Sequence, residues 1–352
     1  MTADLAFYKN KNIFITGHTG FKGAWLITIL KMAGAEITGY SLNPPTDPAL
    51  FDLIKQDGIN SVIGDIRDYE KLKQVFDICK PEIVIHMSAQ PLVLRSYMEP
   101  RYTYETNVMG TVNILEVIRL SNFVKSFVNV TTDKVYHNKE WLWGYREHER
   151  LCGDDPYSNS KSCSELVTYS YKQSFFKNES SPAISTTRSG NVIGGGDFAE
   201  NRIIPDCIRF AEKQEDIILR NPDSVRPYQH VLECLSGYLL LAQKQYEDKD
   251  KYAGCYNFGP DESGCVSTGE LVSIFCEKWG KGQKWIHIGE NQHKEASFLK
   301  LDPSLSKSLL KHENKWGIET AVEKCVDWAK EYLAGGNFNE VMNRQIKEYF
   351  SI

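Results

Sequence analysis

The sequence predicts an α/β fold: a doubly wound parallel sheet with helices on both faces, joined to a smaller mixed α/β C-terminal lobe. Two observations support this prediction. Short runs of β-branched residues alternate with longer amphipathic stretches through the first half of the chain, as in repeated β-α-β units. The unusual polar residues follow the ends of these runs, and the ligands of such sheets bind at the carboxyl ends of the strands.

Six strands are expected where the short β-branched runs occur, at residues 12–15, 36–41, 61–64, 82–87, 126–131 and 184–188. Four helices are expected where the amphipathic stretches occur, at residues 25–33, 69–79, 107–120 and 160–175. A parallel sheet requires such crossover helices, so the two sets of elements support each other.

The alternation loosens after Arg188, where a glycine-rich loop at 194–197 and a turn at 220–223 follow. A helix at 230–245 and a strand at 255–259 are expected to return to the main sheet. We therefore predict a main domain of residues 1–188 plus about 227–262, and a smaller lobe of about 189–226 plus 263–352.

Composition excludes several classes of protein. A net charge of −5 gives no basis for a nucleic-acid partner, and no run approaches the roughly 18 apolar residues of a membrane span. The N-terminal residues lack the apolar core of a signal peptide, and the nine cysteines are scattered without a Cys-x-x-Cys pair. We expect a cytoplasmic protein with reduced thiols, no metal site and no membrane partner.

The first predicted strand runs into the sequence GHTGFKG (residues 17–23), which precedes a helix. Three glycines allow a tight turn and a close approach of the backbone to a pyrophosphate, and the helix N-terminus supplies free N–H groups. A tight turn without a ligand would show the same glycines. The position after the first strand favours a dinucleotide site.

Tyr157 and Lys161 lie four residues apart on a predicted helix, so the phenol and the ammonium share one face. A nearby cation favours the phenolate, which should lower the pKa of Tyr157 and make it a usable base near neutral pH. Taken alone, this spacing is typical of a surface tyrosine and a solvated lysine. Together with the glycine turn and a threonine at the end of a strand, Thr132, it indicates a catalytic pair instead.

Together these motifs resemble the extended short-chain dehydrogenase/reductase family, which has a Rossmann-type fold. The resemblance implies bound NAD in the main domain and a nucleotide sugar in the lobe. Thr132 would hydrogen-bond the reacting sugar hydroxyl, Tyr157 would remove its proton, and Lys161 would hold the nicotinamide ribose. The implied cofactor-binding residues are Gly17, His18, Thr19, Gly20, Phe21, Gly23, Ser41, Asp65, Ile66, Ser88, Ala89, Gln90, Asn107, Thr131, Tyr157 and Lys161.

The second strand ends without the acidic residue that often binds the adenosine ribose in this family. Ser41 or Asn43, which stand there instead, could hydrogen-bond a 2′-hydroxyl, and neither would repel a 2′-phosphate. The sequence therefore leaves NAD and NADP open.

Thr132 is followed by an acid and a base, Asp133 and Lys134, which the oxidation of an alcohol does not need. Such a pair indicates a further step, in which a proton next to the new ketone is removed and water is expelled. Nucleotide-sugar 4,6-dehydratases of the family carry Thr-Asp-Glu here, which implies that Asp133 is the acid. Lys134 is either a neutral base or a cation that stabilises the enolate. A solvated surface pair is the alternative.

Thr-Asp-Lys is the form found in CDP-glucose 4,6-dehydratases, and the resemblance extends over most of the chain. Further stretches that carry it are SAQPLV (88–93), EWLWGYRE (140–147), GNVIGGGD (190–197) and RPYQHV (226–231). It implies conversion of CDP-D-glucose to CDP-4-keto-6-deoxy-D-glucose for deoxysugar biosynthesis, as in a lipopolysaccharide O-antigen. The implied substrate-binding residues are Gln90, Tyr136, Asn191, Arg202, Arg226 and His293.

The sequence departs from the family where the lobe should recognise the sugar and the base. Tyr228, Cys234 and Ser189 replace the usual tryptophan, proline and alanine, and a lysine separates His293 from Glu295. Another nucleotide-sugar dehydratase or a 4-epimerase therefore stays open, and a non-catalytic protein on the same fold is the third alternative. Pairing of helices between subunits, common in the family, implies a homodimer.

Overall fold

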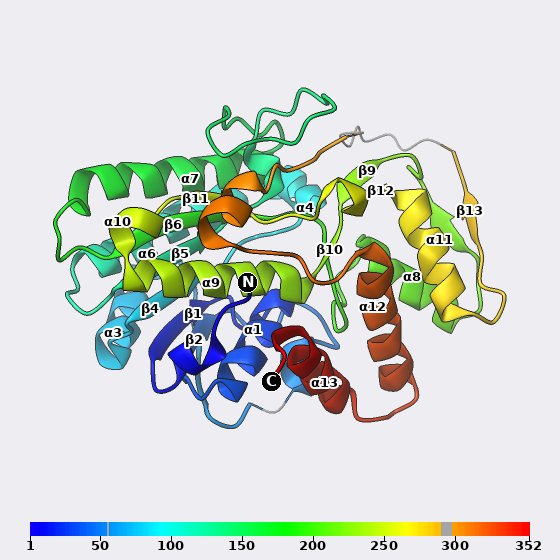
Figure 1. Cartoon of the computed structure of the whole chain (residues 1–352), viewed down its shortest axis with the longest axis horizontal. Helices are drawn as coiled ribbons and strands as arrows, with labels where there is room; N and C mark the ends of the chain where they lie inside the picture. Colours follow the sequence, from blue (N-terminus) through cyan, green and yellow to red (C-terminus); the bar gives the residue numbers. More distant parts are fainter. Residues whose placement is uncertain (55, 290–297) are drawn as a thin grey trace.

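The structure is a computed structural model that describes residues 1–54, 56–289 and 298–352. Among these residues, seven strands form a sheet in the order β11-β6-β5-β4-β1-β2-β3 (Figure 1). Every pair of neighbours is parallel, which confirms the predicted doubly wound α/β fold. The strands are β1 (Asn12–Thr16), β2 (Glu36–Ser41), β3 (Ile59–Ile63), β4 (Ile83–His86), β5 (Ser126–Val130), β6 (Ala183–Arg188) and β11 (Cys255–Asn257).

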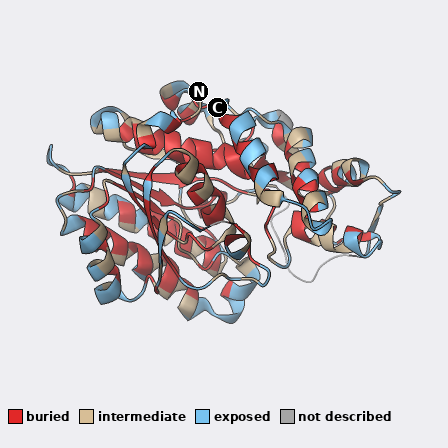
Figure 2. Cartoon of the chain, turned by 90° about the horizontal axis from the view of Figure 1, so that it is seen from below, coloured by how far each residue is buried: buried red, intermediate tan, exposed pale blue. Residues whose placement is uncertain are grey.

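The core is divided between the two faces of the sheet, because successive residues of a strand point to opposite faces. Ile13 and Ile15 of β1 pack with helices α1 (Phe21–Met32) and α9 (Val231–Glu247). Phe14 packs on the other face with α3 (Tyr69–Cys79) and α6 (Gly110–Arg119), and α7 (Pro156–Phe175) also covers that face. Figure 2 shows the resulting buried sheet between helices whose outer sides are exposed.

Shorter elements complete the main body: η1 (Leu5–Tyr8), α2 (Leu50–Leu53), α4 (Val93–Met98), α5 (Pro100–Tyr104), the π-helical turn η2 (Glu105–Met109), the 3₁₀ turn η3 (Asp133–Val135) and α10 (Lys249–Tyr252). The last helix, α13 (Phe338–Phe350), also packs here, since Met342 and Ile346 belong to the same buried cluster as α1 and α9. None of the described helices is long and apolar enough to cross a membrane.

The remaining elements form a smaller lobe beside the sheet, on the right in Figure 1. They are β7 (Val192–Ile193), α8 (Ile203–Glu212), β8 (Ile217–Leu219), β9 (Val225–Pro227), β10 (Gln229–His230), η4 (Glu262–Gly264), β12 (Cys265–Ser267), α11 (Thr268–Trp279), β13 (Trp285–His287) and α12 (Ile318–Leu333). The π-helical turn η5 (Ser306–Leu310) instead packs on the main body, since Leu310 belongs to the same buried cluster as α9. Residues of α8, α11 and α12, such as Ile204, Phe275 and Val322, form a core of their own. The exact domain boundaries stay a prediction.

The observed elements of the main body begin and end within a few residues of those expected. Helix α7 begins at Pro156 rather than at 160, because Asp155 caps it by accepting a hydrogen bond from the Ser158 N–H (3.0 Å). The expected helix at 107–120 is π-helical as far as Met109 and α-helical from Gly110. The early start of α7 places Tyr157 in its first turn.

Four histidines are buried in the core: His18, His86, His230 and His312. Burial lowers their pKa to about 4 for His18 and His312 and to about 3 for His86 and His230, so all four are neutral near pH 7. His86 Nδ1 lies 2.7 Å from Thr16 Oγ1 and so joins β4 to β1. These imidazoles are packing elements rather than free bases.

Glu233, in the first turn of α9, joins the main body to the C-terminal segment. Its carboxylate accepts hydrogen bonds from the backbone N–H groups of Lys315 (3.1 Å) and Trp316 (2.8 Å) and from the hydroxyl of Tyr349 (2.7 Å). The residue is fully buried, and this burial raises its pKa to about 7. One carboxylate thus holds the segment before α12, and α13 itself, against α9.

We expect Glu233→Ala to lower the free energy of unfolding by about 3 kcal/mol, because buried donors that lose their partner cost about 1–3 kcal/mol each. Urea denaturation at about pH 5 measures the change, because there the carboxyl is neutral in the folded protein and the cost of its buried charge, which is present above pH 7, is small. The matched control is Glu277→Ala at an exposed position of α11, for which the change should stay within about 0.5 kcal/mol. Equal changes in the two variants would contradict the role of Glu233.

Candidate active site

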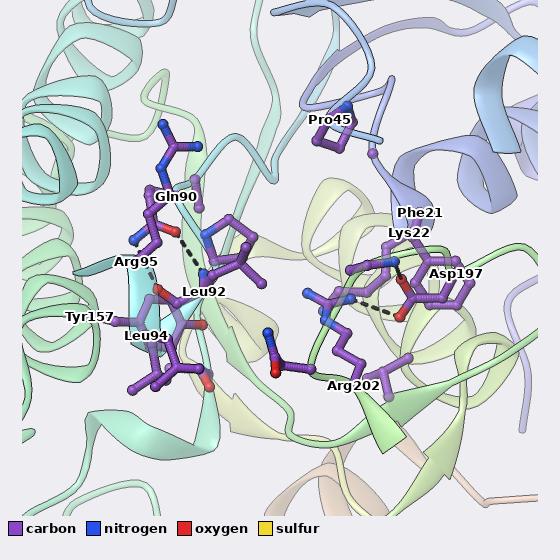
Figure 3. A pocket seen from close by; sticks show the side chains of 18 of the residues that line it. Phe21, Lys22, Pro45, Gln90, Leu92, Leu94, Arg95, Tyr157, Asp197 and Arg202 are labelled. Carbon is purple, nitrogen blue, oxygen red and sulfur yellow. Dashed lines mark hydrogen bonds and ion pairs between the residues drawn. The ribbon is translucent and has the colours of Figure 1, made fainter. Parts of the chain in front are cut away.

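A cleft of about 1800 Å³ lies between the carboxyl ends of the strands and the lobe. It opens where the strand order reverses between β1 and β4, the place where doubly wound sheets bind ligands. Figure 3 shows the cleft, with Gln90 and Tyr157 on one side and Lys22 and Arg202 on the other. The predicted site residues that line it are Gly17, Thr19, Gly20, Phe21, Gly23, Ser41, Asp65, Ile66, Ser88, Ala89, Gln90, Thr131, Thr132, Lys134, Tyr136, Tyr157, Lys161, Asn191, Arg202 and Arg226.

The remaining predicted residues do not line the cleft. His18, Asn107 and Asp133 lie behind its wall, and His293 lies outside the described residues. His18 Nε2 is hydrogen-bonded to Ser61 Oγ (2.7 Å), so this ring supports the glycine turn from the side of β3. Asn107 accepts from the Gln90 N–H (2.8 Å) and donates to Ser160 Oγ (2.9 Å), so it joins the loop after β4 to α7.

The glycine turn between β1 and α1 has room for backbone only. A Cβ atom at Gly17, whose φ is +77°, would lie 2.8 Å from the Ser88 nitrogen, and one at Gly23 would lie 2.3 Å from the Gly17 carbonyl oxygen. Helix α1 begins at Phe21 without a side-chain cap, so no side chain competes for its first N–H groups. This cradle fits the pyrophosphate of a dinucleotide.

Hydroxyl groups and one ion pair occupy the side of the cleft expected to hold adenosine. The hydroxyl oxygens of Thr19 and Ser41 lie 2.9 Å apart. Asp65 is paired with Arg67 at 2.6 Å, and this guanidinium holds the pKa of Asp65 below its usual range. Both hydroxyls and the carboxylate can accept hydrogen bonds from a ribose or an adenine.

Thr132, Tyr157 and Lys161 come together at the end of β5. A side-chain hydrogen bond joins Tyr157 to Thr132, and Lys161 Nζ donates to the Val130 carbonyl (3.1 Å). The predicted lowering of the Tyr157 pKa is wrong for this structure: burial raises it to about 12 and outweighs the hydrogen bond to Thr132. Burial, with a smaller contribution from Lys22, also lowers the pKa of Lys161 to about 7.

Thr132, Asp133 and Lys134 form one hydrogen-bonded unit. The Thr132 hydroxyl donates to Asp133 Oδ1 (2.9 Å), and Lys134 Nζ lies 3.2 Å from the same oxygen. Asp133 is fully buried, whereas 31% of the Lys134 side chain is exposed. Asp133 therefore does not line the cleft itself but is bonded to Thr132 and Lys134, which do, and its acid role stays a prediction.

Gly190 makes room for the carboxylate of Asp133. A Cβ atom at this position would lie 1.8 Å from Asp133 Oδ2. That oxygen has no hydrogen-bond partner in the part of the chain that the structure describes. The backbone of the loop after β6 therefore fixes where the acidic group stands.

A buried ion pair that the sequence did not reveal lies behind these residues. Glu165 of α7 and Arg188 of β6 form two hydrogen bonds of 2.9 Å, and each side chain is 2% exposed. Although burial would raise it, Arg188 holds the pKa of Glu165 below its usual value. The sequence contained a signal for the position of Glu165 near the site. This residue follows Lys161 by four positions and Tyr157 by eight, on the same helix face.

Two of the predicted substrate-binding residues have side chains engaged elsewhere. Gln90 Oε1 accepts from the Leu92 N–H (2.7 Å, drawn in Figure 3), and its Nε2 donates to Thr103 Oγ1 (3.0 Å). The Tyr136 hydroxyl donates to Asn257 Oδ1 (2.7 Å) and accepts from Arg188 (2.8 Å). Both residues shape the cleft, but their polar atoms are already bonded within the protein.

Three other predicted residues are better placed to meet a ligand. Asn191 Oδ1 is buried and has no partner in the described part of the chain. Arg202 Nη1 donates to Asp197 Oδ2 (2.9 Å), and 35% of its side chain remains exposed. Arg226 lines the same cleft. A guanidinium presents a planar set of donors that suits phosphate oxygens.

Lys22, which was not among the predicted site residues, lines the cleft as well. A lysine between the glycines of a phosphate-binding turn was the signal that could have drawn attention to it.

No group of three or more His, Cys, Asp or Glu side chains is placed to hold a metal ion among the described residues.

Comparison with known proteins gives a consistent result. Residues 14–332 match the family model described as GDP-mannose 4,6 dehydratase. The CDP-glucose 4,6-dehydratase of Salmonella typhimurium is 45% identical over 353 residues, which cover 99% of this chain and 98% of that protein.

Two solved structures show the same fold at low sequence identity. The epimerase Mth375 of Methanothermobacter thermautotrophicus matches with a TM-score of 0.82 at 21% identity and covers 97% of this chain and 96% of its own. The dTDP-glucose 4,6-dehydratase of Bacillus anthracis, solved in complex with NAD, matches with a TM-score of 0.78 at 22% identity and covers 93% of this chain and 98% of its own.

The depressed pKa of Lys161 predicts a pH-dependent effect on stability. Its usual pKa is 10.5, and in the folded protein it is about 7. Between these values the unfolded chain binds one more proton, so this group destabilises the fold progressively as the pH falls from about 10.5 to about 7. Lys161→Met should therefore gain stability relative to the wild type at pH 7, and the gain should shrink toward about pH 9.5.

Urea denaturation of both proteins at the two pH values measures this difference. The lost hydrogen bond to Val130 is independent of pH, so it shifts both values alike. Lys125→Met, at an exposed position, is the matched control and should show no such trend. A gain that is equal at both pH values would contradict the burial of a charged Lys161.

Proposed function

The chain belongs to the family of GDP-mannose 4,6-dehydratases and is a nucleotide-sugar 4,6-dehydratase, a hydro-lyase; on this premise we propose that its substrate is CDP-D-glucose and its product CDP-4-keto-6-deoxy-D-glucose. The observation that carries the proposal is the hydrogen-bonded unit of Thr132, Asp133 and Lys134 beside Tyr157. The 45% identity to a CDP-glucose 4,6-dehydratase over nearly the whole chain supports the choice of nucleotide.

We propose NAD as the cofactor, held by the glycine turn and by the residues that follow β2, β3 and β4. The cradle at Gly17 and Gly23, which a Cβ atom would fill, and the uncapped N-terminus of α1 support this assignment. When bound, NAD supplies an acceptor for the hydride of C4′ and a donor for its return to C6′. NADP stays an alternative, because Thr19 and Ser41 do not repel a 2′-phosphate.

Thr132, Tyr157 and Lys161 serve the oxidation at C4′. The Thr132 hydroxyl, held by Asp133, orients the sugar hydroxyl, and Tyr157 Oη accepts its proton. With a pKa of about 12 the phenol is protonated in the free protein. The phenolate base therefore forms only when bound ligands change the surroundings of Tyr157. Lys161, four residues away, is the nearest cation on the same helix face and can then stabilise the phenolate.

Lys134 and Asp133 serve the elimination. A ketone at C4′ makes the C5′ proton acidic, and loss of this proton together with the C6′ hydroxide forms the C5′–C6′ double bond and one water. Lys134 lines the cleft, so we assign the contact with the substrate to this residue. Asp133 is buried and paired with Lys134, so we assign it the negative charge that balances the ammonium of Lys134. Hydride return to C6′ and a proton to C5′ leave no net change in oxidation state.

Arg202, Arg226 and Asn191 bind the diphosphate and the sugar in this proposal. Figure 3 shows Arg202 opposite Tyr157, and Arg226 and Asn191 line the same cleft. Arg202 is restrained by Asp197 and keeps donors for a phosphate oxygen. Part of the cleft is also lined by apolar and aromatic lobe residues, including Phe210, Ile218 and Tyr228, which can enclose a base.

We further propose a homodimer that pairs through α7. Leu166 and Tyr169 of this helix and Met109 of η2 are large apolar residues that are 54%, 63% and 51% exposed. A monomer in light scattering would contradict this proposal. A cytoplasmic location and a place in deoxysugar biosynthesis, such as that of an O-antigen, stay predictions.

The substrate is tested by incubating the purified protein and NAD with CDP-, dTDP-, GDP- and UDP-hexoses. We expect CDP-glucose to yield a product that has lost one water by mass spectrometry and that absorbs in the near ultraviolet in base. Loss of water from another nucleotide sugar would overturn the choice of nucleotide. Conversion without a change of mass would indicate a 4-epimerase, and no reaction with any of the four would contradict the proposal.

Asp133→Asn should separate the two halves of the reaction. The amide keeps the shape of the side chain but removes the negative charge paired with Lys134, so elimination should slow by about 10²-fold or more. Oxidation of the substrate, followed by the near-ultraviolet absorbance of reduced nicotinamide, should change by less than about tenfold.

The control for this experiment is Asp57→Asn, at a side chain that is 82% exposed and is not part of the cleft lining. It should leave both halves unchanged. If Asp133→Asn slows oxidation as much as elimination, the carboxylate acts on Thr132 rather than on the second step.

A further inference from the structure

Lys22 is a cation that the proposed mechanism does not use. Its ammonium lies 5.8 Å from the ring centre of Tyr238 of α9, and the hydroxyl of Tyr238 is hydrogen-bonded to that of Ser189. The Ser189 carbonyl in turn accepts from the Asp133 N–H (3.4 Å). The side chain of Lys22 therefore runs from the glycine turn, along the cleft, to the layer that supports Asp133.

Charged groups of both signs act on Lys22. Burial lowers its pKa; Cys234 and Asp133 raise it, while Arg202 and Lys134 lower it further. On the side of α7, Lys22 contributes to the lowered pKa of Lys161. A further positive charge that enters this part of the cleft would therefore be repelled by several cations at once.

The proposed function brings such a charge to Lys22, and the inference rests on that function. The glycine turn holds the pyrophosphate, and Thr132 with Tyr157 holds the sugar hydroxyl, so hydride transfer requires the nicotinamide ring to lie between these two places. Lys22 lines the cleft and acts on the pKa of Lys161, the residue assigned to the nicotinamide ribose, so its side chain lies near this interval. An oxidised nicotinamide ring carries one positive charge, whereas a reduced ring is neutral.

We propose that Lys22 sets the relative affinity of the cleft for the two forms of the cofactor: its ammonium disfavours the oxidised ring and leaves the reduced ring unaffected. The reaction gains from such a device, since a cation that weakens the oxidised form relative to the reduced form favours the first step, removal of hydride from C4′.

The test is a comparison of three ligands by calorimetric titration: oxidised NAD, reduced NAD, and ADP-ribose, which lacks the nicotinamide. Lys22→Met removes the charge at similar length. We expect it to bind oxidised NAD about tenfold more tightly than the wild type, as expected from removing one unit charge within several ångströms at the permittivity of a protein surface. Affinities for reduced NAD and ADP-ribose should change by less than about twofold.

Lys22→Arg is the matched control, because it retains the cation and should retain the wild-type ratio of the two affinities. Lys22→Gln gives a second neutral side chain if circular dichroism shows that the methionine variant does not fold, and the same tenfold change is expected of it. A ratio that stays the same in both neutral variants overturns the inference.

Equal weakening of all three ligands also overturns it, because Lys22 would then bind the shared pyrophosphate. These outcomes are distinct from a failure of the proposed function. If the wild type binds neither form of NAD, the dinucleotide site itself is wrong and the inference falls with it.

Discussion

The alignment of the active site depends on one buried ion pair, between Glu165 of α7 and Arg188 of β6. Glu165 also accepts hydrogen bonds from Thr131 (2.5 Å), directly after β5, and from Thr186 (2.6 Å), within β6. The pair therefore fixes the helix of Tyr157 and Lys161 against the strand that ends at Thr132. Loss of either partner would leave an unpaired buried charge, which costs about 3–5 kcal/mol, so the constellation cannot be held without both.

The cleft is lined by charges of both signs, and five of its cations are Lys22, Lys134, Lys161, Arg202 and Arg226. Burial makes the charged form of two of them unfavourable in the free protein, since it lowers the pKa values of Lys22 and Lys161. In the proposed function, the diphosphates of the cofactor and of the nucleotide sugar are the anions that these cations would meet.

The features predictable from the sequence are those that short segments specify. The β-branched runs identified the strands, and the glycine turn and the Tyr157–Lys161 spacing identified the site, because each depends on residues close in the chain. The pKa of Tyr157 and the covered position of Asp133 could not be predicted, since both depend on burial by distant segments. The lobe was least predictable, because its strands of two or three residues are too short to show a period.

The four buried histidines have a consequence for the behaviour of the whole chain in acid. Each imidazole takes up a proton near pH 6.5 when the chain is unfolded, but only near pH 3 to 4 when it is folded. Folding in mild acid therefore releases protons from His18, His86, His230 and His312, and each drop in pH below about 6.5 weakens the fold through all four together. The lowest pH at which this protein stays folded is accordingly set by these buried imidazoles of the core, which take no part in its reaction.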